Sequence, residues 1–212
     1  MAGINDRITP VTGVPDRIEW AIELLDIDAD DHIVEIGGGN GVAAQLVLQR
    51  LGPRGRLIFI DRSSVGVARA TDRNGDDPRF VAIEGEVAGV QLQAGSTDKI
   101  FAVNVNVFWA GDAGDELEVV KRALRPEGML LLVYEAPSRD RLDEIGGQGV
   151  LTLTRAGFTA ELRVTEDQAL LAVVAEPTSA ASRRRARGAR PGWTGDASWP
   201  GPSPRSGGCA RE

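Results

Sequence analysis

The sequence has one cysteine and no long apolar run, and each of these absences excludes a class of protein. Its one cysteine, Cys209, excludes an internal disulfide and fits a reducing compartment. The longest apolar stretches, at residues 130–133 and 169–175, are far too short to span a bilayer. No charged segment followed by an apolar run marks a secretory signal. We therefore expect a cytoplasmic protein that does not enter a membrane.

Charge is distributed unevenly along the 212 residues, whose formal net charge is −7. Residues 177–212 contain seven arginines against Asp196 and Glu212, a net charge of +5 that leaves −12 for residues 1–176. Binding to a nucleic-acid backbone requires lysines and arginines that neutralise phosphates. The acidic part of the chain is therefore not expected to bind nucleic acid.

The composition predicts two regions. Residues 1–176 are expected to form one domain with a helical N-terminal lid, whereas residues 177–212 are rich in Pro, Gly, Ser and Arg. Such a segment buries too little apolar surface to offset its ordering entropy, so we expect a disordered basic tail. The Arg183–Arg185 cluster fits a solvated tail better than a contact with nucleic acid or acidic lipid.

Helix-like and strand-like patterns alternate through residues 14–176. Helices are expected at 14–27, 41–51, 63–72, 112–124 and 139–156, and strands at 32–36, 56–60, 80–83, 99–103, 129–134, 158–164 and 169–175. This order predicts an α/β fold, a doubly wound, mostly parallel seven-stranded Rossmann-like sheet that ends in an antiparallel hairpin. Ligands of such sheets bind at the carboxyl ends of the strands.

Glycine occupies alternate positions directly after the first predicted strand, at Gly37, Gly39 and Gly41, with Glu35 just before them. Glycine permits a tight turn and a close approach of a ligand to the backbone. Asp61 ends the second predicted strand, where a carboxylate is able to accept hydrogen bonds from the hydroxyls of a ribose. The two features together predict a nucleoside site.

A dinucleotide site is the alternative at this point. Its G-x-G-x-x-G pattern would require glycine at position 42, where this sequence has Val42. The sequence also shows no Tyr/Lys or histidine catalytic set, so a nicotinamide-dependent oxidoreductase is the weaker hypothesis.

Several segments resemble, in order, the motifs of class I S-adenosylmethionine-dependent methyltransferases. Val34–Gly41 resembles the E/D-x-G-x-G-x-G motif of that family, and Ile58–Asp61 is similar to its acidic second-strand end. The later motifs of the family are matched by Ala82–Val87, Asp98–Asn104 and Leu124–Leu130. The resemblance spans residues 14–176.

The resemblance implies S-adenosylmethionine as cofactor, S-adenosylhomocysteine as product and no metal. Gly37 and Gly39 would run beneath the methionine part, Asp61 would hold the ribose, and Glu86 would reach the adenine amino group. The implied cofactor-binding residues are Glu35, Gly37, Gly38, Gly39, Gly41, Asp61, Arg62, Gly85, Glu86, Val87 and Asn104. At the position of Glu86 the family more often has Asp, whose side chain is shorter. At the position of Gly38 it often has a larger residue, and we expect this difference to alter packing more than binding.

Methyl transfer requires mainly that the acceptor be positioned against the methyl group. His32 begins the first strand, at the wrong end of the sheet for chemistry, so a structural role is expected. Weak catalytic candidates are Asn106 and Trp109, which follow the fourth strand, and Glu135, which ends the fifth. Trp109 fits an acceptor wall and core packing equally well, and Glu135 fits substrate orientation or helix capping.

The acceptor is expected to be a small molecule, because the body is acidic and no insertion provides a separate substrate domain. We expect a monomer or homodimer, with a lid formed by the segment around residues 14–27, where Trp20 is expected to pack. A noncatalytic cofactor-binding or scaffold protein of the same fold is a further alternative.

Overall fold

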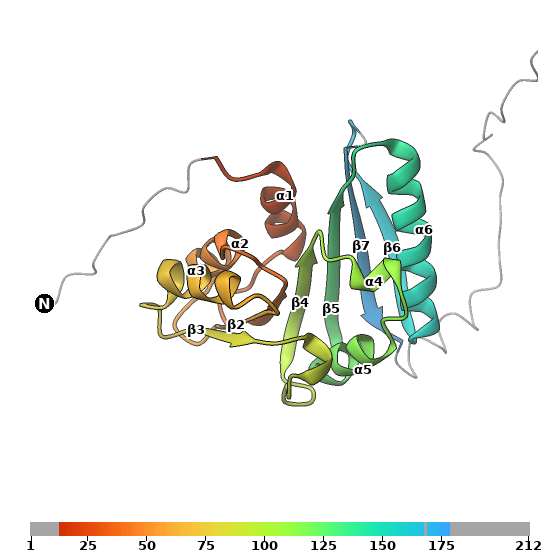
Figure 1. The fold of residues 1–212 in the computed structure, drawn as a ribbon. Helices are drawn as coiled ribbons and strands as arrows, with labels where there is room; N and C mark the ends of the chain where they lie inside the picture. Colours follow the sequence, from red (N-terminus) through yellow and green to blue (C-terminus); the bar gives the residue numbers. More distant parts are fainter. Residues whose placement is uncertain (1–12, 168, 179–212) are drawn as a thin grey trace, which may run out of the picture. The chain divides into compact units, whose positions relative to one another are not determined.

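The computed structural model describes residues 13–167 and 169–178 (Figure 1). The strands within these ranges are β1 (His32–Ile36), β2 (Arg56–Asp61), β3 (Phe80–Glu84), β4 (Thr97–Val103), β5 (Leu124–Glu135), β6 (Phe158–Val164) and β7 (Leu170–Pro177). The helices are α1 (Asp16–Leu25), α2 (Val42–Arg50), α3 (Ser64–Asn74), α4 (Val107–Ala110), α5 (Gly114–Ala123) and α6 (Arg139–Arg155), with a 3-10 turn, η1 (Val87–Gly89). The expected basic tail lies outside the described residues from position 179 onward.

The strands form one sheet in the order β3-β2-β1-β4-β5-β7-β6. Strands β1 to β5 are parallel, and β7 pairs antiparallel with both β5 and β6. This confirms the predicted doubly wound sheet with its closing hairpin. The strand order reverses between β1 and β4, so a crevice is expected at the carboxyl ends of these two strands.

Alternating side chains of each central strand pack against helices on opposite faces of the sheet. In β1, Ile33 packs in a cluster with α1, α2 and α3, whereas Val34 and Ile36 pack in a second cluster with α4, α5 and α6. Figure 1 shows these two groups of helices on the two sides of the sheet. Glu35 is two residues after Ile33, so its side chain points to the same face as Ile33. Its carboxyl group therefore lies beside the apolar cluster formed with α1, α2 and α3.

Helix α1 packs against one face of the sheet. Ala21, Ile22 and Leu25 of α1 are buried against the first cluster, and Trp20 packs on its edge, as expected. Among the described residues, no helix is both long and apolar enough to cross a membrane.

The prediction that a helix runs to Leu124 and a strand begins at Met129 was wrong. Helix α5 ends at Ala123, because Leu124 has an extended backbone and pairs with Thr97 of β4. The pairing resumes at Met129 opposite Lys99, so residues 125–128 form an irregularity inside β5. The pairing of Leu124 with Thr97 across the sheet outweighs its position at the end of a helical pattern.

The glycines of the first turn provide a matched test of local packing. Gly39 and Gly41 both have left-handed φ angles of 58° and 71°, so alanine at either position costs about 1–2 kcal/mol of strain. A Cβ at Gly39 would meet no atom within 4 Å, whereas one at Gly41 would lie 2.8 Å from the Ala70 Cα of α3. We expect Gly41→Ala to lower the free energy of unfolding by about 1–3 kcal/mol more than Gly39→Ala, as measured by urea denaturation. Equal losses in the two variants would contradict this packing.

Candidate functional site

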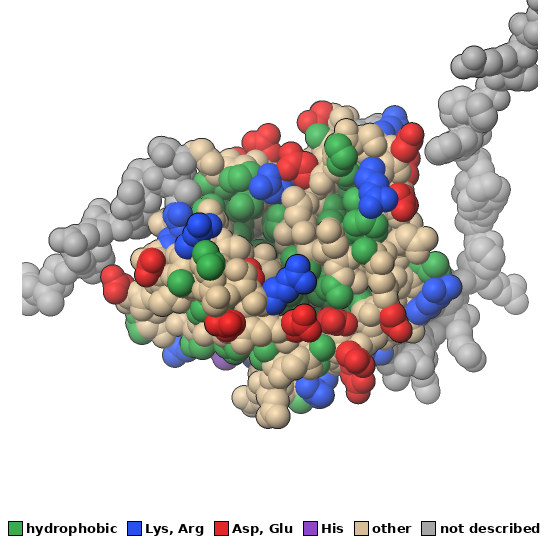
Figure 2. All heavy atoms as spheres, viewed as in Figure 1, with side chains coloured by type: hydrophobic (Ala, Val, Ile, Leu, Met, Phe, Trp, Pro, Cys, Tyr) green, Lys and Arg blue, Asp and Glu red, His purple; other side chains and the backbone are tan. Residues whose placement is uncertain are grey.

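A cavity of about 380 Å³ lies where β1, β2 and β4 end. Its lining residues are Ile36, Gly37, Ile60, Asp61, Arg62, Gly85, Glu86, Val87, Asn104, Val105, Asn106, Val107 and Glu116. Figure 2 shows this face of the molecule hollowed near its centre, with acidic side chains gathered along the edge beside α5. Segments far apart in the sequence therefore meet at the predicted crevice.

The turn after β1 depends on left-handed backbone at Gly37, Gly39 and Gly41, whose φ angles are 69°, 58° and 71°. The Gly37 N–H donates to the Ile60 carbonyl at 2.7 Å, which extends the pairing of β1 with β2. A Cβ at Gly37 would lie 2.6 Å from the Val105 Cγ2. The turn thus combines an unusual backbone with a neighbour that leaves no room for a side chain at Gly37.

Asp61 ties this turn to the end of β2. One of its carboxylate oxygens accepts a hydrogen bond from the Gly39 N–H at 2.9 Å, and the other accepts from the Ser63 N–H at 2.8 Å. The residue is only 8% exposed, yet it lines the cavity. Because each carboxylate oxygen has two lone pairs, Asp61 retains acceptor capacity for ligand hydroxyls.

Glu35 lies beneath the same turn and is 2% exposed. A Cβ at Gly38 would lie 2.3 Å from the Glu35 Oε1 and 2.4 Å from the Phe59 ring. Burial, together with the negative charge of Asp61, raises the pKa of Glu35 from 4.5 to about 8, against a smaller opposite effect of the Ala44 backbone N–H. Glycine at position 38 therefore provides the space that this buried carboxyl group fills.

The raised pKa of Glu35 makes a prediction about stability. Between pH 4.5 and about 8 the folded state keeps a proton that the unfolded state has lost, so the free energy of unfolding falls as pH rises through this window. Glutamine has no such proton. We expect the stability of Glu35→Gln relative to wild type to rise by roughly 3 kcal/mol between pH 5 and pH 8, as measured by chemical denaturation. A pH-independent difference would show that Glu35 ionises normally.

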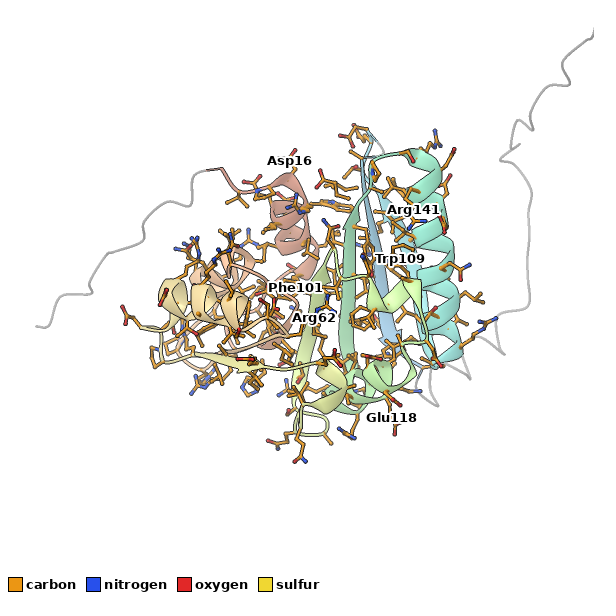
Figure 3. All side chains as sticks on the ribbon, in the orientation of Figure 1. Asp16, Arg62, Phe101, Trp109, Glu118 and Arg141 are labelled. Carbon is orange, nitrogen blue, oxygen red and sulfur yellow. The ribbon has the colours of Figure 1, made fainter. Side chains whose placement is uncertain are left out.

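The side of the cavity next to β3 is formed by η1 and the segments before it. This side is lined by Arg62, Gly85, Glu86 and Val87. Figure 3 labels Arg62 near the middle of the view. Sequence reasoning missed Glu116, which reaches the cavity from the first turn of α5. The helical pattern marks Leu117 and Val120 as inward, but it does not show that the preceding position faces a ligand cavity.

Asn104 forms the corner of the cavity at the end of β4. Its φ angle is 56°, a left-handed value, and its Oδ1 accepts a hydrogen bond from the Glu135 backbone N–H at 2.9 Å. The buried Tyr134 hydroxyl donates to the Val105 carbonyl at 3.0 Å. These bonds fix the segment after β4 to the end of β5, so that Asn104, Val105 and Asn106 keep their places on the cavity wall.

The three weak catalytic candidates lie in different surroundings. Asn106 lines the cavity, but Trp109 and Glu135 are not among its lining residues. The guanidinium of Arg141 lies over the Trp109 ring, 4.6 Å from the ring centroid. Figure 3 labels both residues, and the Trp109 ring packs on the core. Glu135 forms an ion pair of 2.7 Å with Arg17 of α1. The packing interpretation of Trp109 is therefore favoured over an acceptor wall.

A larger cavity, of about 980 Å³, lies at the opposite edge of the sheet. Several of its charged groups already have partners, since Lys99 forms a 2.6 Å ion pair with Asp31, and Arg125 pairs with Asp98. His32 begins β1 at this edge, and its backbone N–H donates to Asp98 at 2.9 Å. This cavity lies away from the switch point at the carboxyl ends of the strands, so we favour the smaller cavity as the ligand site.

Comparison with known proteins connects these features to one family. A family model described as "Methyltransferase domain" matches residues 33–128. An uncharacterised methyltransferase of Bacillus subtilis is 30% identical over 145 residues, which cover 66% of this chain and 78% of that protein. A trans-aconitate 2-methyltransferase of Acidovorax ebreus is 34% identical over 141 residues, 63% of this chain and 52% of that protein.

Other matches are partial or concern the fold alone. A ribosomal RNA small subunit methyltransferase H of Hamiltonella defensa is 31% identical over 102 residues, and this chain spans only 32% of its length. The crystal structure of a methyltransferase from Aquifex aeolicus superposes with a TM-score of 0.62 at 18% identity, over 74% of this chain and 88% of that one.

Proposed function

Because this chain belongs to the S-adenosylmethionine-dependent methyltransferase family, we propose that it transfers a methyl group from S-adenosylmethionine to a small-molecule acceptor. The observation that carries the proposal is the cavity at the strand switch point, which brings together Gly37, Asp61, Glu86 and Asn104. These residues come from four separate motifs of the family, and the fold places them around one space.

The groups that line the cavity fit the chemistry of this cofactor. Asp61 offers carboxylate lone pairs to ribose hydroxyls, and Glu86 offers an acceptor to the adenine amino group. Arg62 and Val87 border the same side and would flank the adenine ring. Asp61, Glu86 and Glu116 give this lining an excess of negative charge over Arg62, which suits a ligand with a cationic sulfur.

The remaining predicted residues would act from behind the cavity. Gly38 and Glu35 would shape the turn from below, while Gly39 is held by Asp61 and Gly41 packs against α3. We assign them a positioning role, in which the turn is fixed before the cofactor binds. Such preorganisation lowers the entropic cost of binding.

When bound, S-adenosylmethionine supplies a methyl group that is already activated by a positive charge on sulfur. The chain's contribution is then to hold the acceptor in line with the methyl group and to exclude water. Asn104 and Asn106 stand at the end of β4, where an acceptor would approach, and their amide groups are able to hydrogen-bond it. An acceptor that is already ionised or unprotonated requires no general base.

A small-molecule acceptor is supported by the charge of −12 on residues 1–176, which disfavours a phosphate backbone. The similarity to a trans-aconitate methyltransferase agrees with it. The ribosomal RNA relatives point the other way, but this chain spans a third or less of their length. We further propose that the protein acts in the cytoplasm, as one domain of residues 1–176.

The proposal is tested by calorimetric titration with S-adenosylmethionine, S-adenosylhomocysteine and NADH. We expect saturable binding of the first two ligands and none of the nicotinamide. Heat from NADH alone would refute the assignment. Turnover is tested next with a panel of small carboxylates, phenols and amines, with release of S-adenosylhomocysteine as the readout. Tight cofactor binding without any product would favour a noncatalytic role.

Asp61→Ala provides a test of the cofactor pose. We expect the substitution to weaken S-adenosylmethionine binding by about 1–3 kcal/mol, because it leaves ribose hydroxyls and the Gly39 N–H without an acceptor. Asp76→Ala is the control, since Asp76 is exposed and lies outside the cavity lining. Unchanged affinity in the Asp61 variant, measured by the same titration, would remove Asp61 from the site.

A further inference from the structure

Glu35 is a buried carboxyl group whose hydrogen-bonding capacity is not fully used. Its Oε2 is inaccessible to solvent and has no hydrogen-bond partner among the described residues. Leaving a buried carboxylate oxygen unpaired is costly, whereas a protonated carboxyl group at the same place costs much less. The geometry therefore favours the neutral form.

The surroundings of Glu35 disfavour its negative charge on balance. Phe59 of β2 lies beside it across the space that Gly38 leaves open. Asp61, at the end of β2, adds a negative charge, and α2 contributes only the backbone N–H of Ala44 in the opposite sense. Together with burial, these neighbours raise the pKa of Glu35 to about 8, so it is largely protonated at neutral pH.

We propose that the buried carboxyl group of Glu35 holds a proton in the free protein, and that binding of S-adenosylmethionine expels this proton to solvent. The inference rests on the proposed function. In the proposed function Gly37 and Asn104 would hold the methionine end of the cofactor, which would bring a positive sulfonium and a positive ammonium group to the cavity beside this turn. A positive charge close to a buried carboxyl group favours its ionised form. The bond that breaks is the O–H bond of Glu35, and the proton passes to the buffer.

Two consequences follow for binding. Because binding releases a proton, the affinity for S-adenosylmethionine rises with pH up to about 8 and then levels off. S-adenosylhomocysteine keeps the ammonium group but lacks the sulfonium charge, so it expels less of the proton. The preference for the methyl donor over the spent product therefore increases with pH over the same range.

The test is calorimetric titration of the full chain at pH 7.5 in phosphate, HEPES and Tris, buffers with different ionisation enthalpies. The slope of the binding enthalpy against the buffer's ionisation enthalpy gives the number of protons released. We expect about three-quarters of a proton for S-adenosylmethionine, less for S-adenosylhomocysteine, and a slope near zero for Glu35→Gln. Glu84→Gln is the control, because Glu84 is an exposed carboxylate at the end of the neighbouring strand β3, and it should retain the wild-type slope.

A zero slope for the wild type, or an equal slope for Glu35→Gln, would overturn the inference while leaving cofactor binding in place. Absence of any binding would instead overturn the proposed function. Infrared spectroscopy of the wild type gives a second measurement if the variant does not fold. The carbonyl band of a protonated carboxyl group should be present in the free protein and disappear when S-adenosylmethionine is added, and persistence of this band would also overturn the inference.

Discussion

The turn from Gly37 to Gly41 is the constraint on which the candidate site depends. Three glycines of the turn lie close to a neighbouring residue, and the neighbour differs in each case. Val105 lies beside Gly37, Glu35 beneath Gly38, and Ala70 behind Gly41. These neighbours come from the loop after β4, from β1 and from α3. The backbone of the turn is therefore in direct contact with three other parts of the domain, and its shape determines where each of them lies.

The same turn connects two carboxyl groups with opposite behaviour. Asp61 accepts hydrogen bonds from two backbone N–H groups and lines the cavity, where its carboxylate is able to accept further bonds from ligand hydroxyls. Glu35 lies in the apolar layer below and has an oxygen without a partner among the described residues. One acidic residue thus presents charge to the ligand, while the other fills the space that a side chain at position 38 would take. This difference in surroundings is the basis of the proposed proton release.

The sequence predicts most of this arrangement because strand periodicity and glycine spacing are local signals. The short apolar run of β1 and the alternate glycines after it identify both the strand and the turn. The early start of β5 at Leu124 could not be predicted, because it depends on pairing with Thr97 across the sheet. The position of Glu116 at the cavity likewise depends on how α5 packs beside η1, which no local pattern reveals. The ion pair of Arg17 with Glu135 joins residues too distant in sequence for any spacing rule.

The central claim is that the cavity at the ends of β1, β2 and β4 holds S-adenosylmethionine. A crystal structure of the protein with S-adenosylhomocysteine tests it most directly. We expect the ribose hydroxyls on the Asp61 carboxylate, the adenine between Arg62 and Val87, and the sulfur facing Asn104. A ligand bound instead in the larger cavity near Lys99 and Arg125, or one that leaves Asp61 without contact, would contradict it.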